Sequence, residues 1–166
     1  MARAQLQFVA DFTDRVHAHL RDALAARYPA RSWETEWYAR RTPVDVAGVP
    51  TDAAAPLVLV EVEMRRADPA NNPVKLARYA HEGDFDRDVR LVHLFSDYYA
   101  LDSGGVSSKR ENAEFVGTLA SDHLDGFAYD AFTLGVAPPK HGATPDGAWR
   151  TAIDEAAAAI DSLLGE

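Results

Sequence analysis

The spacing of apolar positions along the chain predicts four helices. In residues 4–28 apolar side chains recur every three or four positions, which is the period of an amphipathic helix. The same period predicts further helices over 72–79, from 108 onward and from about 145 to 163. Asn72 before Pro73 is typical of an N-cap and first helical position, and Ser108 with Glu111 is typical of a capping box.

Segments rich in β-branched and aromatic residues predict five strands, at 32–38, 42–47, 57–64, 89–95 and 127–134. The third of these begins with the continuous apolar run LVLV, which is typical of a strand buried on both faces. The order of elements is therefore α-β-β-β-α-β-α-β-α, without an internal repeat or a linker. We expect residues 1–166 to form a single domain of the α/β (α+β) class.

Composition narrows the classes of protein that this chain can be. Its 166 residues are 47% hydrophobic and include no cysteine, which excludes disulfides, thiolate metal sites and thiol catalysis. No apolar run approaches the roughly 20 residues of a membrane helix, and no secretory signal opens the chain, so we expect a cytoplasmic protein without membrane contact. The net charge of -9 repels nucleic acid on average, and nucleic-acid binding would therefore require a local basic patch.

The strand at 57–64 ends in two acidic residues that point the same way. Alternate residues of a strand share a face, so Glu61 and Glu63 lie on the same side. If the preceding strand pairs antiparallel with this one, Asp45 approaches Glu61. Carboxylates that converge at one sheet edge are the hard oxygen ligands that Mg²⁺ and Mn²⁺ prefer. The sequence therefore predicts a Mg²⁺ (or Mn²⁺) site here.

This order of elements and acids resembles the PD-(D/E)XK nuclease superfamily, over residues 4–95. The resemblance implies a restriction endonuclease-like αβββαβ core, with a central mixed sheet flanked by helices. It implies that Asp45 is the metal-binding acid and Glu61 the acid of the (D/E)XK element. The lysine position of that element falls on Glu63, which some restriction endonucleases of the superfamily share. Lys75 stands where other members carry a lysine that has migrated to the following helix.

The same resemblance implies a further metal-coordinating acid before the core strands, either Glu34 or Glu36. The functional reading makes Asp45, Glu61 and Glu34 the metal ligands. Glu63 would then complete the site or orient the attacking water, and Lys75 would be an electrostatic helper. The structural reading is that these acids are a solvated strand end that forms salt bridges with nearby arginines.

Basic residues flank the predicted site and form a candidate rim for nucleic-acid phosphates, at Arg40, Arg65, Arg66 and Arg78. Each of them can equally be a solvated loop residue. Lys109 and Arg110 open a predicted helix, where a cation opposes the helix dipole, so they are either exposed residues of the first turn or placed for an external anion.

The histidines add little at this stage. His17 and His19 do not share a helix face, and we expect His93, on the strand at 89–95, to be a hydrogen-bonded and half-buried residue.

Two functions follow, besides the possibility of an unrelated α/β domain with acids on its surface. The first is a metal-dependent endo- or exonuclease that hydrolyses phosphodiester bonds, with DNA as the expected substrate and RNA as the alternative. The second is a catalytically inactive nuclease-like domain that binds protein or nucleic acid. A chain of this size leaves little room for a recognition domain, so reading a target sequence would require a homodimer, another partner or loop contacts.

Overall fold

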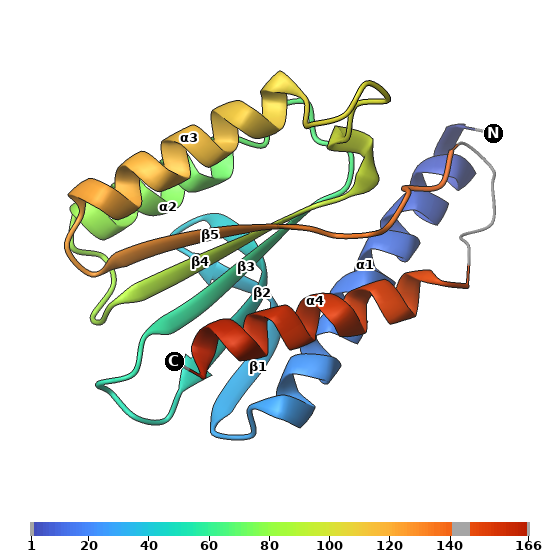
Figure 1. Cartoon of the computed structure of the whole chain (residues 1–166). Coiled ribbons are helices and arrows are strands. Elements are labelled where there is room, and N and C mark those ends of the chain that lie inside the picture. The colour runs from blue at the N-terminus through green and yellow to red at the C-terminus, as the bar shows by residue number, and fades with distance from the viewer. Residues whose placement is uncertain (1, 141–146, 166) are drawn as a thin grey trace.

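A computed structural model describes residues 2–140 and 147–165, with side chains from residue 12 onward. A five-stranded sheet in the order β1-β2-β3-β4-β5 lies between two pairs of helices (Figure 1). The strands are β1 (Arg31–Ala39), β2 (Thr42–Pro50), β3 (Leu57–Glu63), β4 (Val89–Phe95) and β5 (Phe127–Thr133). The helices are α1 (Ala2–Arg27), α2 (Asn71–His81), α3 (Ser108–His123) and α4 (Trp149–Leu164), with a 3₁₀ turn η1 (Asp97–Tyr99) after β4.

The sheet is antiparallel on one side of β3 and parallel on the other. β1 pairs antiparallel with β2, and β2 with β3, whereas β3, β4 and β5 are mutually parallel. The predicted αβββαβ order and mixed sheet are confirmed. Since β3 and β4 run the same way, their carboxyl ends meet at one edge of the sheet, the edge at which β2 begins.

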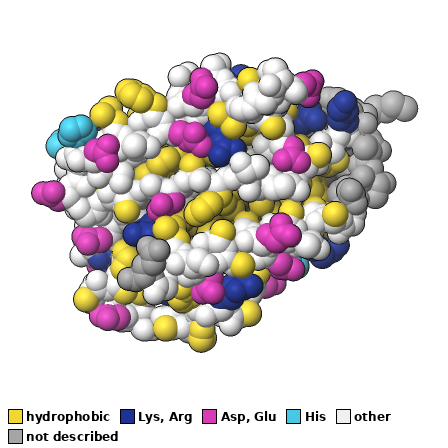
Figure 2. All heavy atoms as spheres, viewed as in Figure 1, with side chains coloured by type: hydrophobic (Ala, Val, Ile, Leu, Met, Phe, Trp, Pro, Cys, Tyr) yellow, Lys and Arg dark blue, Asp and Glu magenta, His cyan; other side chains and the backbone are white. Residues whose placement is uncertain are grey.

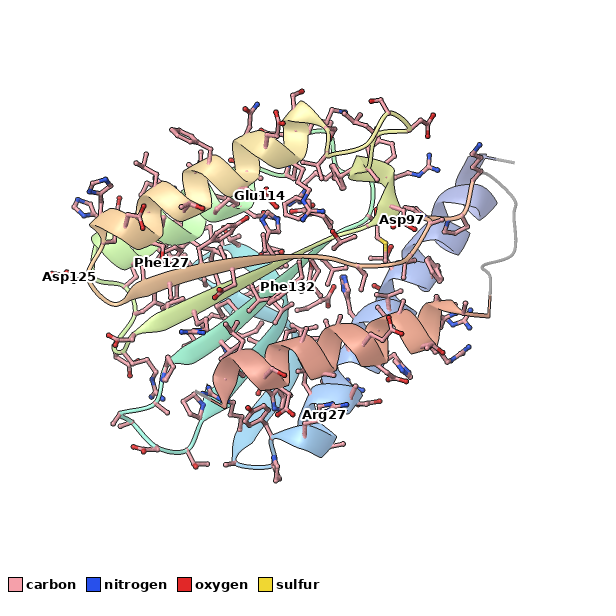
Figure 3. All side chains as sticks on the ribbon, in the orientation of Figure 1. Arg27, Asp97, Glu114, Asp125, Phe127 and Phe132 are labelled. Carbon is pink, nitrogen blue, oxygen red and sulfur yellow. The ribbon has the colours of Figure 1, made fainter. Side chains whose placement is uncertain are left out.

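Each face of the sheet carries its own hydrophobic core. α1 and α4 pack on the face that presents Val58, Val60 and Val62, and α2 and α3 pack on the face that presents Leu57 and Leu59. Every residue of β3 is buried, as its apolar start predicted. Figure 3 shows the same alternation on β5, where Phe127 lies toward α2 and α3 and Phe132 toward α4.

The starts of the helices differ from the prediction. α2 begins at Asn71 after the N-cap Ala70, so Asn72 lies inside the helix and its buried side chain is free to bind elsewhere. The N-cap of α3 is Ser107 rather than Ser108, and its side chain makes no capping hydrogen bond. The predicted start of the last helix near residue 145 lies outside the described residues, and α4 begins at Trp149.

The surface agrees with the net charge of the chain. On the face in Figure 2, Asp and Glu side chains are scattered among neutral ones, and Lys and Arg are fewer. Among the helices in the described ranges, none combines the length and the apolar character that crossing a bilayer requires.

Candidate metal site

Asp45 stands where β2 and β3 separate. The paired residues of the two strands end at Val46 and Val60, and beyond them the Asp45 Oδ2 atom accepts a hydrogen bond of 2.8 Å from the main-chain N–H of Val62. A carboxylate thus replaces the main-chain carbonyl that would otherwise continue the ladder. The antiparallel pairing brings Asp45 beside Glu61, as the sequence predicted.

Glu61 is a buried carboxyl group with an unused oxygen. Its side chain is 2% exposed, Oε2 accepts a long hydrogen bond of 3.4 Å from Asn72, and Oε1 has no hydrogen-bond partner. Burial raises the pKa of Glu61 well above its ordinary value, and the neighbouring charge of Asp45 raises the pKa further. A buried acid with an unpaired oxygen is costly unless a proton or a cation satisfies it.

His17 on α1 lies near the Asp45 carboxylate and lines the same cavity as Glu61. It is 7% exposed, its Nε2 atom lies 3.7 Å from Asp45 Oδ2, and Nε2 has no hydrogen-bond partner. The sequence did not single out His17, because we considered only whether it shares a helix face with His19, which it does not. The available signal was that His17 lies next to Val16 and within one turn of Leu20 on the apolar stripe, so docking of the helix buries it.

A cavity of about 260 Å³ opens over these groups. His17, Asp45, Glu61 and Glu63 contribute to its wall from α1, β2 and β3, and Arg65 and Arg66 lie at the end that follows β3. Anionic ligands and cationic side chains therefore meet in one space, which suits a metal ion and a phosphate together.

Glu63 belongs to a buried hydrogen-bond network that extends from the cavity to β4 and β5. Its Oε1 atom accepts hydrogen bonds from Asn72 at 2.7 Å and from His93 Nε2 at 2.9 Å, and His93 Nδ1 lies 2.9 Å from the hydroxyl oxygen of Tyr129. His93 is completely buried, and burial also raises the pKa of Tyr129. Arg66 donates to the Asn72 side chain at 2.8 Å, which connects the network to the cavity.

The remaining acids and the lysine lie outside the wall of this cavity. Glu34 is exposed on β1 opposite Ala47, and Glu36 is exposed with a left-handed φ of 52°. Lys75 is half-buried on α2, three residues after Asn72, and neighbours it on the helix surface. Of the residues predicted from the sequence as metal ligands, the structure brings Asp45 and Glu61 together.

The predicted basic rim divides into two groups. Arg65 and Arg66 line the cavity, whereas Arg40 and Arg78 lie at the ring of Tyr79, at 4.4 and 5.3 Å from its centroid. Arg40 also forms ion pairs with Glu82 and Asp84. At the tip of the β1–β2 hairpin the charge of Arg40 is therefore balanced by the acids that follow α2.

The donor set fits a divalent cation, although it is not a preformed triad. Among the side chains described at 12–140 and 147–165, no three His, Asp or Glu residues already stand together as metal ligands. Two unpartnered buried atoms, Glu61 Oε1 and His17 Nε2, nevertheless lie in the cavity wall beside Asp45. Carboxylate oxygens with one imidazole nitrogen suit Mn²⁺, and the carboxylates alone suit Mg²⁺.

Comparison with known proteins adds two distant structural likenesses. No family model and no curated protein matches the chain. A repair endonuclease from Pyrococcus abyssi matches at 20% identity and a TM-score of 0.35, over 66% of this chain and 40% of that one. A structure of an EndoMS–dsDNA complex matches at 19% identity and a TM-score of 0.36, over 68% of this chain and 39% of that one. The chain spans about two fifths of both proteins, and likenesses at this level do not assign it to a family.

Proposed function

We propose that this protein is a metal-dependent nuclease that hydrolyses phosphodiester bonds in DNA through Mg²⁺ or Mn²⁺. Asp45 and Glu61 are the metal ligands, and His17 is a third ligand that the sequence alone did not suggest. The observation that carries the proposal is the buried Oε1 atom of Glu61, which has no partner and belongs to a cavity shared with Asp45. A divalent cation would satisfy this oxygen and relieve the repulsion between the two carboxyl groups.

A bound ion would polarise the phosphodiester and lower the pKa of a water molecule. The chain supplies the rest. Glu63 is held on its Oε1 side by Asn72 and His93, and its Oε2 atom accepts no hydrogen bond from a described residue, so it can orient the attacking water. Arg65 and Arg66 are exposed at the cavity and can hold the phosphate oxygens.

The direct test is to measure cleavage of plasmid DNA in the presence of Mg²⁺ or Mn²⁺, and in EDTA as the metal-free control. We expect cleavage that depends on the ion, and a loss of at least about 100-fold in Asp45→Asn, since even residues behind the metal ligands contribute about 10–100-fold. Asp125→Asn is a matched control, because Asp125 is exposed at the turn between α3 and β5 (Figure 3). Equal cleavage by wild type and Asp45→Asn would contradict the proposed site.

The second candidate function is a nuclease-like module that binds DNA without cutting it. It is favoured by one observation, the glutamate at the usual lysine position, whose Oε1 is bound to His93 and Asn72. Calorimetry that detects no divalent-ion binding, together with binding of DNA, would support this candidate over the first.

A further inference from the structure

Tyr98 is an exposed aromatic ring with a cation close to it from each of two segments. It lies on η1 and is 42% exposed. The guanidinium carbon of Arg65, just after β3, lies 5.4 Å from its ring centroid, and the Lys109 ammonium, in the first turn of α3, lies 5.6 Å from it. Arg65 and Lys109 are themselves exposed. We call these three residues the Tyr98 surface.

The two cations of the Tyr98 surface have no acidic partner. Among described residues, Arg65 donates only a long hydrogen bond to the Pro138 carbonyl, at 3.4 Å, and neither Arg65 nor Lys109 forms an ion pair. Asp97 precedes Tyr98 in the chain, but it lines a different cavity, with Phe12 and Trp149, and lies toward α1 in Figure 3. In a chain of net charge -9, two neighbouring cations without a counter-charge make a local basic patch.

Tyr98 is held in place rather than loosely attached. Its main-chain N–H donates to the Ser96 hydroxyl oxygen at 3.3 Å, and Ser96 in turn donates to the Met64 carbonyl at 2.6 Å. The ring packs edge-on against Tyr99, whose hydroxyl donates to the Arg66 carbonyl at 2.8 Å. The ring is thus tied to the segment after β3 that lines the metal-site cavity.

We propose that the Tyr98 surface binds a nucleic-acid strand in single-stranded form as it leaves the metal-site cavity. A base would stack on the Tyr98 ring in place of a cation that now lies over it, and Arg65 and Lys109 would turn to the phosphates on either side. Arg65 connects the metal-site cavity to the Tyr98 surface, because it contacts Tyr98 and also lines the cavity. A single strand fits better than a duplex, since the bases of a duplex are stacked on one another. The inference rests on the proposed function for its substrate class.

Binding of a labelled single-stranded DNA oligonucleotide, measured by fluorescence anisotropy with EDTA present, tests the surface without any cleavage. We expect Tyr98→Ala to weaken binding about tenfold or more, which is the usual effect of losing one stacked base. Tyr98→Phe retains the ring and should bind like wild type. Lys109→Ala should lower the slope of log affinity against log salt by about 0.7, the value for one phosphate contact on a single strand.

The chain offers matched controls for each change. Tyr38→Ala removes another exposed tyrosine, and Arg78→Ala removes a cation from the ring of Tyr79, which is only 6% exposed. Both controls should bind as wild type does. No binding by wild type, or unchanged binding by folded Tyr98→Ala, overturns the inference. If binding depends on Tyr98 but plasmid DNA stays intact with every metal, the nuclease proposal fails and the surface stands.

Discussion

Glu61 and Glu63 lie two residues apart on β3, point to the same face of the sheet and are 2% and 3% exposed. Their surroundings nevertheless differ. Glu63 Oε1 receives two short hydrogen bonds, from Asn72 and His93, whereas Glu61 keeps one oxygen without a partner beside Asp45. Burial therefore does not distinguish the two acids here, but the hydrogen bonds that they receive do, since Glu63 accepts two short ones and Glu61 a single long one of 3.4 Å.

The difference follows from the neighbouring elements. Glu63 is near β4 and the first turn of α2, which supply nitrogen donors, while Glu61 is opposite the start of β2, which supplies another carboxylate. A buried carboxyl group with two close donors stabilises a fold, and a buried oxygen without a partner keeps a capacity for binding a cation. We thus expect removal of a Glu63 partner to lower stability, and substitution of Glu61 to lower cleavage.

The largest effect on stability should come from the Glu63 network. His93→Ala removes one of the two nitrogen partners of the buried Glu63 side chain, and breaking a buried pair typically costs about 3–5 kcal/mol. Urea unfolding of wild type and His93→Ala measures the difference. His19→Ala is a suitable control, because the contact of His19 with Asp154 is exposed. A loss in His93→Ala no larger than in His19→Ala would mean that the network is not structural.

Glu61→Gln should separate activity from stability. Cleavage should fall by about 100-fold or more, since a neutral amide cannot replace the ligand charge. The folded protein keeps the proton of Glu61 to higher pH than the ordinary value of 4.5, so the folded state binds more protons and its stability falls as pH rises above that value. Glutamine resembles the protonated acid at every pH, so the Glu61→Gln variant should not lose this stability as pH rises.

Melting temperatures of wild type and Glu61→Gln without metal, from about pH 5 to about pH 8, measure this effect. We expect the variant to be the more stable protein at the upper end and the gap to narrow toward acid. A gap that widens toward acid would show that Glu61 is ionised in the folded protein without a cation.

A smaller loss of stability should follow from crowding Tyr129, the last residue of the hydrogen-bonded chain that begins at Glu63. A Cβ at Gly117 on α3 would lie 2.4 Å from the Tyr129 ring, so Gly117→Ala must displace that ring from His93. Overpacking of this kind costs about 1–3 kcal/mol. Gly135→Ala is the control, because its Cβ would meet only the Ala152 Cβ at 3.9 Å. Equal unfolding midpoints for the two variants would show that the Tyr129 position is not constrained.

Much of the fold and the core of the site were predictable from the chain. The approach of Asp45 to Glu61 required only period-two alternation and a hairpin between adjacent strands, which are local properties. The same alternation correctly placed Glu63 on the face of Glu61. It could not show that Glu63 would be paired, because its partner His93 comes from β4, thirty residues later.

The errors share one cause, which is that tertiary partners override local preferences. Asn72 has the sequence context of an N-cap, yet its amide binds two buried acids, and that contact outweighs a cap on an exposed helix start. The sequence places Arg40 and Arg78 beside the elements that carry the predicted site, but the hairpin tip and α2 hold them at Tyr79. His17 joins the site only because α1 docks beside β2.

Calorimetric titration of the wild-type protein with Mn²⁺, in buffers of different ionisation enthalpy, tests the central claim most directly. We predict saturable binding with release of protons, because burial raises the pKa of Glu61 and a bound cation favours its ionised form. Asp45→Asn should abolish that binding, and Asp125→Asn should preserve it. Absence of binding in wild type, or equal binding in Asp45→Asn, would contradict the account.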